Sequence, residues 1–199
     1  MTGRSERSAI SATDLMAELQ NNPKYQRREQ AQEAERQARA EVLSKAEQPI
    51  VEDLRVAGVE VASVWDLVNT SEPYPGALPV LMEHVERGGY PERVMESLGR
   101  ALAVRPSVEF WDRLKVRWLE ARDSGEETGA AVALAACANK AQLDDLVGFL
   151  SVAERGMSRL HFIRPILRYG GDRGRMVVEA LRGDPVFGEE ATALLKRRK

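Results

Sequence analysis

The sequence predicts an all-α protein built from stacked helix pairs, an α-solenoid. Only 6% of the residues are aromatic, and the abundant Ala, Glu, Arg and Leu lose little side-chain freedom in a helix. Apolar residues recur at spacings of three and four, as on one face of a helix. Landmark positions Leu81, Leu114, Leu146 and Val178 are 33, 32 and 32 residues apart. A fixed period of this kind is typical of repeat proteins, whose units bury their apolar faces against each other.

The clearest unit spans residues 75–104, two amphipathic helices joined by a Gly-Gly-Tyr-Pro turn. Gly88 and Gly89 end the first helix, and Pro91 suits the first turn of the second, where its missing N–H costs nothing. Each helix carries four apolar residues on one face, which we expect in the core. They are Leu78, Leu81, Met82 and Val85 in the first helix and Val94, Leu98, Ala101 and Leu102 in the second.

Three weaker copies follow. The second begins with a helix that carries Phe110, Trp111, Leu114 and Trp118, and a turn around residues 121–127 ends it. Further helices are expected at residues 127–138, 143–152, 160–171, 174–184 and 186–198. Pro165 falls inside one of them, where a proline removes a backbone hydrogen bond, so we expect a kink there.

From about residue 75 to residue 199 the chain resembles the HEAT-repeat family of α-solenoids. The resemblance rests on ALPVL at residues 77–81, on PERV at residues 91–94 and on the face that Leu98, Ala101 and Leu102 complete. It implies a right-handed solenoid of about four helix pairs, with a period shorter than the ~40–47 residues usual for the family. The family pattern is structural, so it implies no catalytic residues.

Four segments are expected along the chain. Residues 1–12 are polar and of mixed charge, which predicts disorder. Residues 13–48 form a polar helical arm, residues 49–74 form short helices that cap the array, and residues 75–199 form the repeat domain. In the capping segment, Pro49 begins a helix, and Ser63 with Asp66 makes a capping box at the start of another.

The arm is expected to hold a short helix from Thr13 and a long charged helix from Pro23. Ala and Val side chains make a narrow seam along the long helix, at Ala31, Ala34, Ala38 and Val42. Such a seam buries little area. The arm is therefore either protruding and loosely docked or a coiled-coil contact, with self-association through residues 23–47 as one possibility.

Net charge is −2, but its distribution is uneven. Residues 151–199 carry 11 Lys and Arg against 6 Asp and Glu, while the other 150 residues carry 18 against 25. The one cysteine, Cys137, lies in an apolar run and cannot form an intramolecular disulfide. Neither a signal peptide nor an apolar run of about 20 residues occurs, so we expect a cytoplasmic protein without a membrane partner.

No pattern of catalytic or metal-binding residues is found, which predicts that the chain is not an enzyme and uses no cofactor or metal. His84 and His161 lack the nearby ligands that zinc requires. Three pairs of adjacent carboxylates fall in the first turns of predicted helices, where they complement the helix dipole. Trp111 and Trp118 are seven residues apart, and core packing explains both.

A basic series in the last third is the strongest indication of a partner. It consists of Arg155, Arg159, Arg164, Arg168, Arg173, Arg175 and Arg182. Either these side chains line a groove for an acidic protein segment or phosphates, or they are solvated and several pair with Glu154, Asp172 or Glu179. The candidate partner-binding residues are Arg93, Glu96, Arg100, Arg159, Arg164 and Arg168. Arg164 and Arg168 share a face of a second-type helix, and the resemblance to HEAT-like arrays implies that such helices line the concave side.

Three functions remain open at this point. The first is a non-enzymatic protein-binding or scaffold module that uses the concave face of the solenoid. The second is a nucleic-acid-binding or base-repair protein, similar to the DNA glycosylases built on HEAT-like repeats; Trp111 and Asp112 invite that comparison. The third is a protein that neutralises a toxin or inhibits another partner.

Overall fold

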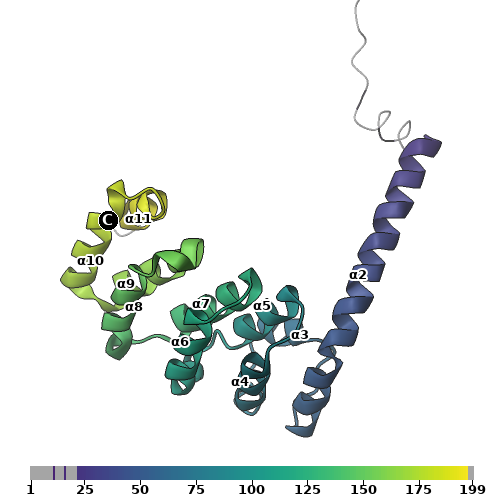
Figure 1. The fold of residues 1–199 in the computed structure, drawn as a ribbon, viewed down its shortest axis with the longest axis horizontal. Coiled ribbons are helices and arrows are strands. Elements are labelled where there is room, and N and C mark those ends of the chain that lie inside the picture. The colour runs from purple at the N-terminus through teal and green to yellow at the C-terminus, as the bar shows by residue number, and fades with distance from the viewer. Residues whose placement is uncertain (1–10, 12–15, 17–21, 197–199) are drawn as a thin grey trace, which may run out of the picture. The chain divides into compact units, whose positions relative to one another are not determined.

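The computed structural model describes residue 11, residue 16 and residues 22–196, and within them every regular element is helical (Figure 1). The all-α prediction is therefore confirmed. The expected disorder of residues 1–12 and the short helix from Thr13 fall outside the described residues, apart from residues 11 and 16. The chain divides into two compact units, which meet between Val42 and Leu43.

Ten α-helices lie in the described residues. They are α2 (Pro23–Val56), α3 (Val64–Asn69), α4 (Ala77–Arg87), α5 (Glu92–Ala101), α6 (Trp111–Leu119), α7 (Ser124–Cys137), α8 (Leu143–Phe149), α9 (Ile163–Tyr169), α10 (Gly171–Ala180) and α11 (Gly188–Lys196). Short 3₁₀ segments accompany them at Arg105–Phe110, Lys140–Gln142, Ala153–Phe162 and Leu181–Gly183.

The first unit holds the N-terminal part of α2. Its Ala seam is exposed throughout, and Val42 is 60% exposed. Ion pairs within the helix, such as Arg39 with Glu35, lie along this charged surface. Both alternatives for this segment, a protruding arm and a coiled-coil contact, remain predictions.

The helix break expected at Pro49 does not occur. α2 continues through Pro49 to Val56, and Gly58, at φ +81°, reverses the chain beyond it. A proline lacks only one backbone N–H, so a helix with buried anchors on either side can pass it with a single hydrogen bond lost. Ile50 and Leu54, both fully buried, are such anchors on the C-terminal side.

Two rows of helices build the second unit. α3, α5, α7, α9 and α11 contact one another in succession, and we call them the central row. α4, α6, α8 and α10 pack against members of this row. The connector at residues 59–62 is not helical, and Ser63 with Asp66 forms the predicted capping box of α3.

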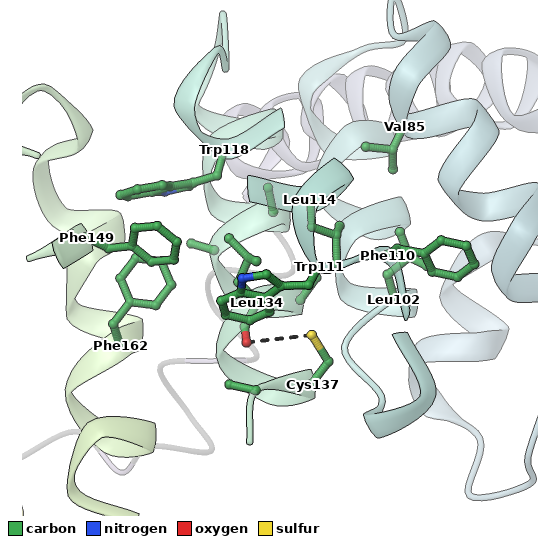
Figure 2. Packing of buried hydrophobic residues seen from close by; sticks show 14 of the residues in the cluster. Val85, Leu102, Phe110, Trp111, Leu114, Trp118, Leu134, Cys137, Phe149 and Phe162 are labelled. Carbon is green, nitrogen blue, oxygen red and sulfur yellow. Dashed lines mark hydrogen bonds between the residues drawn. The ribbon is translucent and has the colours of Figure 1, made fainter. Parts of the chain in front are cut away.

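The predicted core is confirmed. Leu81, Leu114, Leu146 and Val178 are all fully buried, and the predicted apolar residues of α4 and α5 are buried too. Trp118 packs against Phe149 and stands edge-on to Phe162, with ring centroids 4.9 and 5.0 Å apart (Figure 2). Its indole N–H donates to Ser158 Oγ at 3.0 Å, which satisfies the one polar atom of the ring.

Side-chain links join helices roughly one repeat apart. Arg113 on α6 donates to Glu86 on α4 at 2.6 Å, Lys115 on α6 to Asp145 on α8 at 3.1 Å, and Arg173 on α10 pairs with Asp144 on α8 at 2.7 Å. The partners are 27, 30 and 29 residues apart along the chain. These links connect each of the helices α4, α6, α8 and α10 to the next one in the series.

Pro165 does not kink a helix. α9 begins only at Ile163, because the residues before it adopt a 3₁₀ segment with a break at Gly156 (φ 42°, ψ −126°). Pro165 thus lies in the first turn of α9, where backbone N–H groups have no partner within the helix. The prediction failed because the helix was expected to start at residue 160.

Candidate interaction site

A hollow of about 370 Å³ opens beside the central row, between α7, α9 and α11. The lining comes from Val132, Ala135 and Ala136 of α7, Leu160 and His161 of the 3₁₀ segment, Arg164, Pro165, Arg168 and Tyr169 of α9, and Glu190 of α11. It therefore combines a basic wall, an apolar floor and one acidic group.

The basic wall follows from residue spacing. Arg164 and Arg168 are four residues apart on α9, so both lie on one face, and His161 precedes them by one turn. Buried Ile163, Ile166 and Leu167 hold the opposite face of α9 in the core. Both arginines are exposed, Arg164 with 70% of its side chain. The core thus fixes the wall while its charges remain accessible.

The floor consists of small side chains because α7 is rich in alanine. Ala131, Ala133 and Leu134 of α7 are buried, whereas Ala135 is partly exposed and Ala136 is exposed. Short side chains leave space above the helix backbone, and this space is the hollow.

Charges around the hollow are only partly compensated. Arg164 faces Glu190 at 4.0 Å, the outer limit of an ion pair. The Arg168 guanidinium lies 5.4 Å from the centre of the Tyr169 ring, and among the described residues no carboxylate lies within ion-pair distance of it. Desolvation and then the positive charge of Arg100 lower the pKa of His161 below its ordinary value.

The predicted residues of α5 lie on the same row but are already engaged. Arg100 donates to Glu96 at 2.7 Å, and the Arg93 guanidinium lies 5.9 Å from the centre of the Trp65 ring. Arg93, Glu96 and Arg100 do not line the hollow.

Arg159 does not belong to this surface. It is only 8% exposed, its guanidinium donates to the carbonyls of Leu150 and Gly156 at 2.8 and 2.9 Å, and it lies over the Phe187 ring. Sequence reasoning included it in the basic series and among the candidate partner-binding residues. Its position in a 3₁₀ segment, with a different angular spacing from an α-helix, points it into the core instead.

Most other members of the basic series form ion pairs. Arg155 pairs with Glu127 at 3.6 Å, Arg173 with Asp144 at 2.7 Å, and Arg175 with Glu179 at 2.9 Å. Glu179 was an expected partner, whereas Glu127, Asp144 and Glu190 come from neighbouring repeats. Sequence alone could not identify these three, because they are brought near only by the stacking of helices.

His84 forms a buried polar chain that the sequence did not reveal. Its ring is fully buried, with Nε2 3.0 Å from Asp53 Oδ2 and Nδ1 2.6 Å from the Tyr90 hydroxyl. Arg87, which can only donate, also faces Nδ1 at 3.4 Å, so the proton resides on Nε2. The ring is inaccessible to any substrate. These hydrogen bonds join α2, α4 and the turn after α4, and we regard them as structural.

Other candidate groups are also accounted for by structure. Trp111, 7% exposed, donates to Asp145 at 2.7 Å, and burial raises the pKa of the Cys137 thiol to about 12. The three carboxylate pairs lie in the first turns of α7, α8 and α11, as predicted. Among the described residues no cluster of three or more His, Cys, Asp or Glu side chains could hold a metal ion.

Comparison with known proteins adds no family. No protein-family model matches the chain, and neither the curated proteins nor the solved structures yielded a significant match. Of the helices in the described residues, none combines the length and apolar character that crossing a bilayer requires. The arrangement of side chains is therefore the basis for any statement about function.

Proposed function

We propose that this chain is a non-enzymatic binding module that holds another protein on the central row of a right-handed, HEAT-like solenoid. The observation that carries the proposal is the hollow beside α9, where two exposed arginines stand above an apolar floor. Mixed basic and apolar surface of this kind suits a protein segment, which offers both carboxylates and apolar side chains. The HEAT-like assignment, the handedness and the self-association of the arm remain predictions.

Ion pairing favours a protein partner over nucleic acid. Nucleic-acid affinity grows with the number of phosphates that free Lys and Arg neutralise. In the basic series Arg155, Arg173 and Arg175 are paired, and Arg159 is buried. The comparison with base-repair proteins also loses support, because the Trp111 ring is buried and its N–H bonds to Asp145.

The experiment is an affinity pull-down from nuclease-treated lysate with three forms of the protein. Wild type is compared with Arg164→Glu/Arg168→Glu and with the matched double reversal Arg173→Glu/Arg175→Glu on α10. We expect a specific protein to be recovered with wild type and the α10 variant and lost with the α9 variant. Thermal melts establish that each variant is folded.

Two results would reject the proposal. One is the recovery of no specific protein, together with duplex or single-strand binding that weakens steeply as salt is raised. The other is identical recovery by all three proteins, which would remove the face that carries α9 from the binding function.

A further inference from the structure

We propose that the hollow between α7, α9 and α11 recognises an acidic segment of the partner, with one carboxylate on Arg164, another on Arg168 and an apolar side chain on the α7 floor. This inference rests on the proposed function and specifies the chemistry of the segment. It also assigns to Glu190 the role of an internal competitor for Arg164.

The two arginines are the donors available in this hollow. A guanidinium binds a carboxylate best through two parallel N–H bonds. Arg168 makes no such pair with any described residue, and the 4.0 Å separation of Arg164 from Glu190 is too long for one. Both donors can therefore take an external carboxylate without first breaking a strong ion pair.

Their spacing determines which segments fit. Side chains four apart on a helix lie about 6 Å from each other. Two carboxylates at i and i+4 of a partner helix, or at i and i+2 of an extended segment with about 7 Å between them, match that separation. A single acidic residue engages only one arginine.

The floor adds a requirement that an inorganic anion cannot meet. Ala135, Ala136 and Pro165 line the hollow with apolar surface. A small apolar side chain such as Ala, Val or Leu would bury this surface, whereas a bare phosphate would leave it wet. Glu190 lies in the same lining and repels a dense polyanion. A sparsely acidic, partly apolar peptide is the ligand class that fits all three groups.

Glu190 offers a specific signature. Removing its charge with Glu190→Gln frees Arg164 and should tighten binding of an acidic peptide by about two- to fivefold, the range of an exposed ion pair. Glu189→Gln makes the same change in net charge one residue away. Glu189 does not line the hollow, so this variant should have a smaller effect.

The test begins with a display selection of random 12-residue peptides on the full chain, counter-selected with the double variant Arg164→Gln/Arg168→Gln. We expect enriched peptides to carry two acidic residues at matching spacing together with small apolar residues. Affinities of the synthetic peptides are then measured by fluorescence anisotropy. Arg168→Gln should weaken binding about five- to tenfold, and Arg175→Gln, which changes the same charge on α10, should have little effect.

The inference is overturned if the enriched peptides lack acidic residues, if none is enriched, or if Glu190→Gln and Glu189→Gln act alike. It is also overturned if inorganic phosphate or a single-stranded oligonucleotide binds in place of the peptide with the same dependence on Arg168. Such results leave the proposed function standing whenever the pull-down still recovers a protein that depends on the α9 face. Failure of the pull-down removes the proposed function itself.

Discussion

Gly99 on α5 and Gly129 on α7 bring their backbones into direct contact. A Cβ atom added at Gly99 would lie 2.2 Å from the carbonyl carbon of Gly129, and one added at Gly125 would lie 2.0 Å from the carbonyl oxygen of Glu92. Neither approach is possible for any other residue. The α5–α7 crossing therefore depends on glycine at two places along the contact.

The first prediction concerns this crossing. Gly99→Ala must push the two helices apart, so we expect a loss of about 3 kcal/mol or more of unfolding free energy. Gly129→Ala should cost less, since its Cβ would meet the Met95 carbonyl oxygen at 3.0 Å. Gly148→Ala on α8, with no atom within 4 Å, should be neutral or stabilising by about 0.5–1 kcal/mol. Urea denaturation gives all three values, and equal losses at positions 99 and 148 would contradict the close contact.

A second prediction tests the buried role of Arg159. Replacing it with Met leaves the carbonyls of Leu150 and Gly156 without their donor and removes the contact with Phe187. We expect a loss of about 1.5–3 kcal/mol in thermal or urea unfolding. Arg168→Met, at an exposed position of the next helix, serves as the control and should change stability little. If the Arg159→Met protein were stable but bound its partner more weakly, Arg159 would belong to the interaction surface and not to the core.

Pro49 provides the third prediction. Pro49→Ala restores the missing backbone donor inside α2 and should raise stability by about 1–3 kcal/mol, because proline is roughly 3 kcal/mol less favourable than alanine in a helix interior. Pro79, exposed in the first turn of α4, provides the matched control, since no helical hydrogen bond is lost there. Unchanged stability and unchanged helical circular dichroism in Pro49→Ala would indicate a break in α2.

The fourth prediction is a pH dependence that arises from His84. Burial, and then the charge of Arg87, lower the pKa of His84 below its ordinary value of 6.5, although Asp53 and Glu83 act in the opposite direction. The Tyr90 hydroxyl also faces the ring. Above pH 6.5 the ring is neutral in both the folded and the unfolded protein, so the contribution of His84 to the free energy of unfolding is fully present. Below pH 6.5 the unfolded chain takes up a proton that the folded chain does not, so stability falls until the folded pKa is reached.

The measurement compares urea unfolding at pH 7.5 and 5.5 in a His161→Gln background, because the pKa of His161 is lowered too. The slope attributable to His84 cannot exceed about 1.4 kcal/mol per pH unit, the value for one proton. A second substitution, His84→Gln, should lower stability at both pH values and abolish this part of the slope. A slope that survives that substitution would assign the pH dependence to other groups.

The helical architecture could be predicted because its causes are local. Apolar periodicity found the buried faces of α4 and α5, and the capping box found the start of α3. The predictions at Pro49 and Pro165 were wrong because the effect of a proline depends on where its helix begins. The start of the helix depends in turn on which apolar side chains are buried in the core. The 3₁₀ segment Ala153–Phe162 fills the gap expected between the helices at 143–152 and 160–171, but it also takes in residues 160–162, which the sequence assigned to the second of these helices.

The candidate site was predictable in part. Spacing alone placed Arg164 and Arg168 on one face, and both line the hollow. Glu190 and the alanine floor of α7 were missed, because they reach the hollow only when α7, α9 and α11 are stacked. One signal was present for the close crossing of α5 and α7: Gly125 and Gly129 are four apart, a spacing that lets a second helix approach closely.

Links such as Glu86–Arg113 and Asp144–Arg173 have a consequence for how the chain reaches this structure. Each closes a loop of about one repeat, and loop-closure entropy grows only slowly with length, so no single step requires distant parts of the chain to meet. Topologies rich in such short-range contacts fold fast. We expect a helix pair made early in synthesis to serve as the template for the next. We also expect amide exchange to be slowest at the α5–α7 crossing and faster toward α11.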